Sequence, residues 1–359
     1  MKVVILGLSI TSSWGNGHAT NFRGLVRALA ERGHDVAFLE RDVPWYALHR
    51  DLPHPPHGRT VLYGSLDELA THAPLVAAAD LVVVGSYVPE GIAVAEWVLR
   101  TARSVTAFHD IDTPVTVAAL DGGTCEYLTP ALAARFDLYL SFTGGPTLDV
   151  LRERYGVRRP RAFHCLVDPD AYRPLDVEAR FDLGYLGTYS ADRQPGLERL
   201  LLEPARRRPD LRFAVAGPLY PDSIRWPANV ERIEHLAPDE HPGFYAAQRF
   251  TLNITRADMV RAGWSPSVRL FEAAACAVPV ISDRWPGLHD VFVDEREILV
   301  ADTSDDVLRH LDDAGGERRD AIGRAARHRV LDGHTAAHRA VELEVHVAGV
   351  LASGGPRGA

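Results

Sequence analysis

Residues 264–288 read WSPSVRLFEAAACAVPVISDRWPGL, and they predict a capped helix that leads into a short buried strand. Ser265 is a favourable N-cap, and the proline after it suits the first helical position because its missing N–H would have no intrahelical partner there. The amides of Ser267, Val268 and Arg269 would then face out of the helix start, in front of the positive end of the helix dipole. With the Ser267 hydroxyl and the Arg269 guanidinium nearby, this helix start predicts a pocket for a phosphorylated ligand.

Glu272 is an acid on the apolar side of the same expected helix. It lies four residues after Val268 and one after Phe271, so helical spacing places its carboxylate on the buried face. A buried carboxylate needs a partner. The helix start is roughly 9 Å away along the axis at 1.5 Å per residue. A nucleoside diphosphate spans that distance, with its phosphates at the helix start and its ribose hydroxyls donating to Glu272. The alternative is an acid near the helix edge that pairs with an arginine.

Composition and length set the class of protein. A chain of 359 residues with 24% charged and 46% hydrophobic residues is typical of a globular protein, and its length favours two domains. No apolar run is long enough to span a bilayer, and the N-terminus leads directly into a glycine loop, so we expect a cytoplasmic protein without a transmembrane segment. Three widely separated cysteines indicate a reducing compartment and no zinc site. The net charge of −9 argues against nucleic acid as the main partner.

Apolar strands alternate with helices in both halves of the chain, which predicts an α/β fold with parallel sheets. Strands are expected at residues 3–8, 36–39, 81–85, 105–109 and 138–142, and again at 183–186, 213–216, 230–235, 250–254 and 278–282. Helices are expected at residues 22–32, 92–101, 197–206 and 335–351. The series restarts near residue 170. We therefore expect two doubly wound Rossmann-like domains that face a cleft, because ligands bind at the carboxyl ends of the strands in such sheets.

The expected domain boundaries follow from this series. An N-terminal domain would span residues 1–168 and a C-terminal domain residues 169–334. A last helix, residues 335–352, would pack back on the first domain, and residues 353–359 would form a disordered tail because they carry no apolar face.

Five motifs together give the chain a resemblance to a known group of enzymes. They are the glycine loop SSWGNGHATN before the first helix, the His109-Asp110 pair after a strand, YLGTYSADRQ at residues 185–194, AGP at residues 216–218, and SPSVRLFEAAACAVPVISD at residues 265–283. With these motifs the chain resembles the GT-B fold glycosyltransferases, in particular the retaining GT4-like group with an acidic donor-binding helix and its CgeB-like branch. The likeness spans nearly the whole chain.

The resemblance implies a nucleotide-sugar donor bound by the C-terminal domain, with no cofactor. Glu272 matches the ribose-binding acid of the family, and Ser267 with Val268 matches the turn whose amides hold the diphosphate. Arg193 falls near the basic residue that neutralises the departing diphosphate, a role that guanidinium donors suit. A helix-start residue in solvent is the alternative for Arg193. The other residues expected to contact the donor are Gly15, Gly17, Gly187, Gly217, Pro218, His235, Leu236, Ser265 and Arg269.

The N-terminal domain would present the acceptor. The family places a histidine against the donor sugar at the end of a strand, and His109 occupies that position, although a lone histidine there is more often structural. The amides of the Gly-Asn-Gly loop could approach the donor phosphates or the acceptor. The acceptor-binding residues that we expect are Trp14, Asn16, Tyr87 and Asp110. The acceptor itself is not identified by the sequence, and neither is the oligomeric state.

Two details test the resemblance. Asp110, Ile111 and Asp112 spell a DxD triplet, which ligates a divalent metal in a different glycosyltransferase fold, but GT-B enzymes generally need no metal, and we expect none here. The family's first donor acid lies eight residues before the second, and here that position is Trp264. An indole N–H is a donor only and cannot accept the hydrogen bonds of sugar hydroxyls. With Trp264 in that position, neither the identity of the donor sugar nor retention of configuration follows from the resemblance.

We therefore expect a metal-independent, retaining glycosyltransferase with His109, Arg193 and Glu272 as its catalytic residues. A nucleotide-sugar epimerase or hydrolase on the same fold is an alternative, with Asp110 and Asp112 as the candidate acid and base. A two-domain sugar-binding protein without catalysis is another.

Overall fold

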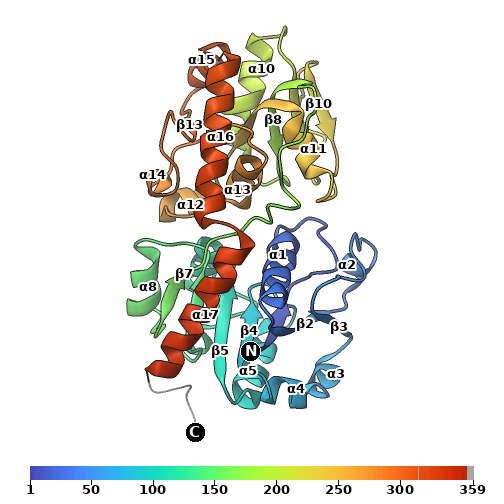
Figure 1. Ribbon diagram of the computed structural model, residues 1–359, viewed down its shortest axis with the longest axis vertical. Helices are drawn as coiled ribbons and strands as arrows, with labels where there is room; N and C mark the ends of the chain where they lie inside the picture. Colours follow the sequence, from blue (N-terminus) through green and yellow to red (C-terminus); the bar gives the residue numbers. More distant parts are fainter. Residues whose placement is uncertain (314, 354–359) are drawn as a thin grey trace. The chain divides into compact units, whose positions relative to one another are not determined.

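The computed structural model describes residues 1–313 and 315–353, which form two compact units (Figure 1). Unit 1 consists of Met1–Leu166 together with the last helix, α17 (Ala336–Ala352). Unit 2 consists of Val167–Thr335. The tail expected over residues 353–359 lies outside the described residues except for Ser353.

Unit 1 is built on a seven-stranded parallel sheet in the order β3-β2-β1-β4-β5-β6-β7. The order reverses between β1 and β4, as in doubly wound folds. The strands are β1 Lys2–Gly7, β2 Asp35–Arg41, β3 Arg59–Tyr63, β4 Leu81–Gly85, β5 Val105–Asp110, β6 Leu138–Ser141 and β7 Pro160–Ala162. The central strand β4, with the sequence LVVVG, is buried along its whole length, which fits a sheet that is covered on both faces.

The helices of unit 1 connect these strands. They are α1 His18–Glu31, α2 Pro44–Ala47, α3 Leu66–Ala70, α4 Ala73–Ala77, α5 Gly91–Thr101, α6 Thr113–Asp121, α7 Pro130–Ala133 and α8 Thr147–Glu153. Helix α17 lies beside α1 and near β5 (Figure 1). Its Glu344 carboxylate pairs with Arg32 and His34 at 2.7 Å each, which adds a polar clamp to the packing of α17 on unit 1.

Unit 2 repeats the arrangement with six parallel strands in the order β10-β9-β8-β11-β12-β13. The strands are β8 Phe181–Leu186, β9 Phe213–Ala216, β10 Val230–Ile233, β11 Gln248–Asn253, β12 Val280–Ser282 and β13 Leu299–Val300. The helical segments are α9 Gln194–Leu197, the π-helical turn Glu198–Leu202, α10 Glu203–Arg207, α11 His241–Ala246, α12 Ala257–Ala262, α13 Val268–Ala275, α14 Leu288–Val291, α15 Ser304–Asp313 and α16 Gly316–Gly333. Helix α16 packs on α13.

The fold class predicted from the sequence, two doubly wound α/β domains, is confirmed by these sheets. Three strands were not predicted: β3, β7 and β13, which lie at sheet edges. Strand β3 is mostly half-buried, β7 begins with Pro160, and β13 has two residues, so none shows the continuous apolar run of a central strand. Among the described helices, none is long and apolar enough to cross a membrane.

Candidate functional site

The start of helix α13 lies later than the sequence predicts. Its N-cap residue is Ser267, in extended conformation, so the prediction that Ser265 caps the helix is wrong. The Ser265 hydroxyl donates instead to the carbonyl of Gly263 at 2.8 Å. The Ser267 hydroxyl donates to Asn253 Oδ1 at 2.8 Å, and no side chain caps the helix. The first amides of α13 and the positive end of its dipole therefore remain available to an anion.

Asn253, the last residue of β11, connects the helix start to the sheet, and its role was not predicted. Its Oδ1 accepts hydrogen bonds from Ser267 Oγ at 2.8 Å and from Arg269 Nη1 at 2.9 Å. Its Nδ2 donates to Ser282 Oγ at the end of β12 at 3.0 Å. In the sequence, this role is indicated by a polar residue, Asn253, at the end of the segment FTLN. Because these residues are buried and bonded to one another, they fix α13 against the carboxyl ends of two strands.

Arg269 is buried and bends back toward strand β8. Its Nε donates to the carbonyl of Leu186, and its guanidinium lies 4.7 Å from the centre of the Tyr185 ring. A Cβ atom at Gly187 would lie 2.8 Å from Nη2, so this close approach requires glycine. Two of its donor groups, Nε and Nη1, bond to protein oxygens, and a direct contact with a phosphate stays a prediction. Both of its hydrogen-bonded partners, Leu186 and Asn253, are neutral, and the carboxylate of Asp283 is close enough to interact with its charge.

Glu272 is buried on the inner face of α13, as its spacing predicts. Tyr245 Oη donates to Glu272 Oε2 at 3.1 Å. Burial, the charge of Glu272 and their hydrogen bond raise the pKa of Tyr245 well above its ordinary value, so this hydroxyl stays a donor. The partner of the acid is a tyrosine rather than the arginine of the alternative interpretation.

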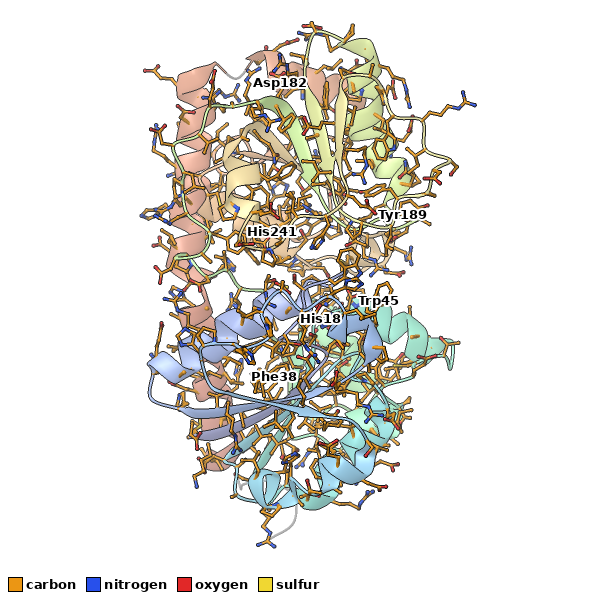
Figure 2. All side chains as sticks on the ribbon, turned by 90° about the vertical axis from the view of Figure 1, so that its right-hand side faces the viewer. His18, Phe38, Trp45, Asp182, Tyr189 and His241 are labelled. Atoms are coloured by element: carbon orange, nitrogen blue, oxygen red, sulfur yellow. The ribbon has the colours of Figure 1, made fainter. Side chains whose placement is uncertain are left out.

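The loops after β8 and β9 pack tightly at the same edge of the sheet. Gly187 N donates to Ala216 O at 2.8 Å, and Tyr189 N donates to Pro218 O at 3.0 Å. Gly217 has a φ of 139°, and a Cβ there would lie 2.1 Å from the Gly187 carbonyl oxygen, so only glycine fits. Figure 2 shows Tyr189 and Asp182 at opposite ends of β8, with Tyr189 at the carboxyl end.

Arg193 is the N-cap residue of α9, in the loop that follows β8. Its Nη2 donates to the carbonyl of Thr188 at 2.7 Å, and its Nε is buried without a hydrogen-bond partner. A second guanidinium thus carries its charge at this edge with a neutral partner. Leu236, after β10, also belongs to this edge, and its carbonyl lies 3.3 Å from His241 Nε2.

Trp264 precedes α13 in an unusual conformation. Its φ is 43°, in the left-handed region that few non-glycine residues adopt. Its indole N–H donates to Asp290 Oδ2 at 2.6 Å, and its ring covers Gly287, where a Cβ would lie 2.6 Å from the ring atoms. The indole is therefore held by α14 and the turn that precedes α14. At the position where the family has its first acid, this chain has an aromatic ring.

In unit 1, the glycine loop is anchored by Glu40 at the end of β2, a residue that the sequence interpretation missed. Both Ile10 N and Thr11 N donate to Glu40 Oε2, at 2.6 and 3.0 Å, and Thr11 Oγ1 donates to Oε1 at 2.6 Å. Glu40 is fully buried. In the sequence, this role is indicated by an acid, Glu40, at the end of the segment VAFLE. These two loop amides are satisfied by a carboxylate of the chain itself, so they cannot bind a phosphate.

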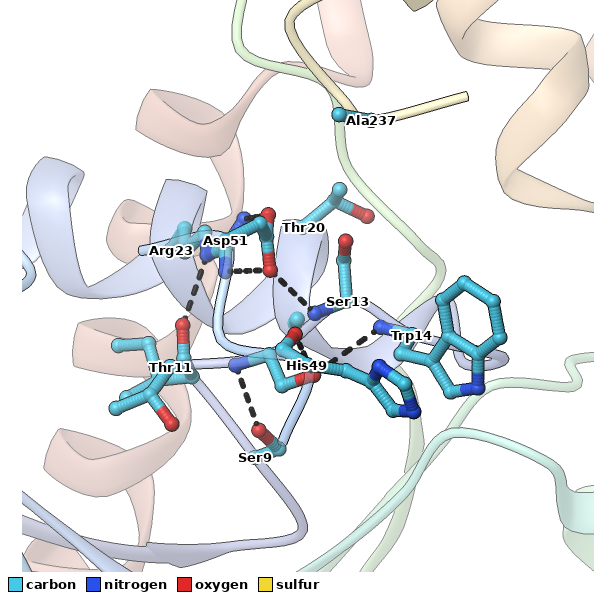
Figure 3. Close-up of polar contacts among 12 residues, drawn as sticks. Ser9, Thr11, Ser13, Trp14, Thr20, Arg23, His49, Asp51 and Ala237 are labelled. Carbon is cyan, nitrogen blue, oxygen red and sulfur yellow. Dashed lines mark hydrogen bonds and ion pairs between the residues drawn. The ribbon is translucent and has the colours of Figure 1, made fainter. Parts of the chain in front are cut away.

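Asp51 fixes the next part of the loop (Figure 3). It accepts from Ser13 N at 2.7 Å and from both Nη atoms of Arg23, at 2.8 and 3.1 Å. The hydrogen bonds of Arg23, together with the amide of Ser13, hold the pKa of Asp51 below its ordinary value although burial opposes the shift. The loop up to residue 13 is therefore rigidly bound to the chain.

The glycines of the loop lie beyond this anchored part. Gly15 has a φ of 66°, and both Gly15 and Gly17 are exposed. The Asn16 side chain caps the start of α1, since its Oδ1 accepts from Ala19 N at 3.1 Å. The Trp14 ring stacks on His49 with centroids 4.4 Å apart (Figure 3). The side-chain amide of Asn16 is thus committed to the loop, whereas Gly15 and Gly17 are exposed.

His109 is the penultimate residue of β5 and is almost entirely buried, in edge contacts with Phe22 and Phe163. Its Nδ1 has no hydrogen-bond partner. Burial, with a smaller contribution from the nearby His18, lowers the pKa of His109 to about 3, so the imidazole is neutral near neutral pH. The cavity beside it measures about 10 Å³, which is room for one water and too small for a sugar.

Asp110 does not support its expected role as an acceptor ligand. It is fully buried, and it accepts hydrogen bonds from Tyr139 Oη at 2.6 Å and Thr116 Oγ1 at 2.7 Å. Burial raises its pKa to about 6. Tyr87, with a φ of 62°, donates to Asp112 Oδ2 at 3.0 Å. Asp110 and Asp112 of the DxD triplet are therefore tied to different partners, and within residues 1–313 and 315–353 no cluster of acid, histidine or cysteine side chains has the form of a metal site.

Comparisons with known proteins agree with this architecture. In three dimensions the chain is similar to sucrose-phosphate synthase from Thermosynechococcus elongatus, with a TM-score of 0.71 at 15% identity over 98% of this chain and 100% of that one. It is similar to the Anabaena protein HepE in complex with UDP-glucose, with a TM-score of 0.68 at 14% identity over 98% and 100% of the two chains. An α-glucosyltransferase in complex with UDP gives a TM-score of 0.72 at 13% identity over 97% and 100%. At these identities the likeness is one of fold.

Two doubly wound units with parallel sheets, together with the similarity to these solved structures, define the GT-B fold. Residues 193–344 match the family model described as Glycosyl transferase-like. The chain accordingly has the GT-B fold, and residues 193–344 match a glycosyltransferase family, which confirms the resemblance to GT-B glycosyltransferases inferred from its motifs. A comparison with curated proteins gave no match.

Proposed function

We propose that the protein transfers a sugar from a uridine diphosphate sugar to a hydroxyl or amine acceptor, with retention of the anomeric configuration. One observation carries the proposal: two arginines with neutral partners, an uncapped helix start and a buried acid gather at one edge of the sheet in unit 2. The sequence alone does not identify the nucleotide of the donor. Uridine is supported by HepE and the α-glucosyltransferase, which were solved with UDP-glucose and UDP.

The diphosphate is the group that the charges of this edge fit. Its phosphates lie at the first amides of α13, in the positive field of Arg269. Arg193 turns its free donors toward the bridging and terminal oxygens and stabilises the negative charge that develops as the diphosphate leaves. With this charge balance the transfer needs no bound metal. The base lies by His235 and Leu236, and the ribose hydroxyls donate to Glu272.

Unit 1 supplies the acceptor side of the proposal. Trp14, stacked on His49, is the acceptor contact that we favour, since Asn16 bonds to the start of α1 and Asp110 is buried. Tyr87, whose hydroxyl donates to Asp112, remains an acceptor-binding residue in the proposal. Cys125, Cys165 and Cys276 form no disulfide among the described residues, and we propose a cytoplasmic location.

Replacing Glu272 tests the proposal. In Glu272→Gln the side chain keeps its size but loses the charge that accepts the ribose hydroxyls, and we expect UDP to bind about 10- to 100-fold more weakly, since hydrogen bonds to charged groups contribute about 1.5–3 kcal/mol. Titration calorimetry measures the affinity, and circular dichroism checks the fold. Glu203→Ala, which removes an exposed acid of α10, is the matched control.

Two results would contradict the proposal. Unchanged affinity of Glu272→Gln for UDP would remove the ribose assignment. Conversion of UDP-sugar to free sugar or to an epimer in the absence of acceptor, at a rate equal to that with acceptor, would favour a hydrolase or an epimerase instead of a transferase.

A further inference from the structure

Tyr172 is a buried residue that lies between Glu272 and His241 in unit 2. Its hydroxyl oxygen is 3.1 Å from His241 Nδ1, and the two ring centroids are 6.2 Å apart. Burial, then the negative charge of Glu272, raises the pKa of Tyr172 well above its ordinary value, so the hydroxyl keeps its proton. One tyrosine thus adjoins both the candidate ribose acid and a histidine of the next helix.

The hydrogen-bond partners of His241 define its tautomer. Its Nε2 lies 3.3 Å from the carbonyl oxygen of Leu236, which can only accept. Nε2 must therefore carry the hydrogen, and Nδ1 of the neutral ring accepts from the Tyr172 hydroxyl. The direction of donation runs from Tyr172 through His241 to the carbonyl of Leu236.

The segment that carries Leu236 is a short closed turn between β10 and α11. Ala237 N donates to Glu240 Oε2 at 2.9 Å, and Glu240 N donates to Ala237 O at 2.9 Å. These bonds close the turn but do not reach the Leu236 carbonyl. Its hydrogen-bond partner is His241, which begins α11 (Figure 2). The orientation of this carbonyl therefore depends on the imidazole, and the imidazole depends on Tyr172.

We propose that Tyr172 and His241 are positioning residues that fix the Leu236 carbonyl relative to the Glu272 carboxylate. The base and the ribose of one nucleotide are then recognised together. This inference rests on the proposed function. A backbone carbonyl has two lone pairs, and His241 occupies one of them. The other faces a base that presents an imino N–H, as uracil does at N3. Adenine offers a donor only at its exocyclic N6 amino group, which stands at a different place on a larger ring, so a carbonyl fixed for the uracil N3–H favours uracil over adenine.

The test compares the affinities of UDP and ADP for matched tyrosine variants. Tyr172→Phe keeps the buried ring and removes the hydroxyl that orients His241. A lost hydrogen bond of about 1 kcal/mol corresponds to about fivefold, so we expect the preference for UDP over ADP to fall about fivefold. Tyr245→Phe is the control, because Tyr245 donates to Glu272 and is not bonded to His241. It should change both affinities by the same factor, since both nucleotides carry a ribose.

Variants of His241 separate positioning from a loss of packing. In His241→Gln, a side-chain N–H can still reach the Leu236 carbonyl, and the preference for UDP should be largely kept. In His241→Ala it should be lost. Calorimetry gives the affinities, and thermal unfolding shows that each variant is folded. An unchanged ratio of UDP to ADP affinity in both Tyr172→Phe and His241→Ala would overturn the inference while leaving the proposed function standing. A wild-type protein that binds UDP no better than ADP would overturn the proposed uridine donor itself.

Discussion

The two units are built on the same strand order, yet the charges at the carboxyl ends of their strands differ. In unit 1, two carboxylates, Glu40 and Asp51, accept hydrogen bonds from the loop amides of Ile10, Thr11 and Ser13. In unit 2, the buried carboxylate of Asp283 accepts from the amide of Thr255 at 2.9 Å, and two arginines lie at the same edge. The guanidinium groups of Arg193 and Arg269 donate to neutral oxygens, and no side chain caps the start of α13.

This difference shows how one scaffold serves two purposes. Loop amides that are already satisfied by carboxylates form a rigid wall with no affinity for phosphate. A helix start beside guanidinium groups that donate to neutral oxygens attracts an anion, because both the dipole and these side chains are positive there. The architecture is shared, whereas the assignment of a binding role depends on the sign of a few buried side chains.

Removing Glu40 should produce the largest effect. In Glu40→Ala the buried amides of Ile10 and Thr11 and the Thr11 hydroxyl lose their acceptor, and each unsatisfied buried donor costs about 1–3 kcal/mol. Allowing for entry of water, we expect a loss of about 3 kcal/mol in the free energy of unfolding, measured by urea denaturation. Glu31→Ala, which breaks an exposed pair with Arg27, should cost less than about 1 kcal/mol. Equal losses in the two variants would show that Glu40 does not anchor the loop.

The sequence predicted the elements whose signals are local. The run LVVVG is a buried strand, Gly33 follows the first helix, and the spacing of Glu272 placed its carboxylate on the buried face of α13. Arg193 was placed correctly in the loop after β8, because that position depends only on where the strand ends. Its role in transfer remains a prediction.

What the sequence missed depends on pairings between distant residues. Glu40 accepts from a loop about thirty residues earlier, and Arg269 reaches Leu186, so both contacts follow from the strand order rather than from neighbouring residues. Asp110 looked accessible because it ends a strand, but its side chain turns inward to Tyr139. Ser265 had the chemistry of an N-cap, yet its hydroxyl is bound by the carbonyl of Gly263.

Arg193→Ala removes a positive charge from the edge of the sheet in unit 2, and we expect the next largest effect from it. Without its guanidinium, the charge on the departing diphosphate loses a preorganised donor, and loss of one such donor reduces kcat by about 100- to 1,000-fold. Arg193→Lys should recover part of the rate, because an ammonium keeps the charge but not the paired donors. Turnover of UDP-glucose is the measurement. Arg206→Ala, which breaks an exposed pair with Glu198, serves as the control and should retain full activity.

The smallest effect that we predict concerns the pH dependence of stability in unit 1. Burial lowers the pKa of His109 to about 3 and that of His18 to about 4. As the pH falls below the ordinary histidine value of about 6.5, the unfolded chain binds protons that the folded chain does not, so stability falls in that window. Asp110 acts in the opposite sense, because its raised pKa of about 6 lets the folded chain bind a proton first.

Replacing His109 should therefore flatten the loss of stability on the acid side. Each buried neutral histidine contributes up to about 1.4 kcal/mol per pH unit between its two pKa values, so His109→Gln should reduce the slope by about that amount between about pH 6 and pH 4. Asp110→Asn should steepen it, since the opposing group is removed. Urea denaturation at a series of pH values measures both slopes. An unchanged slope in His109→Gln would mean that the imidazole is protonated in the folded protein, and unit 1 would then carry a positive charge at the edge that now contrasts with unit 2.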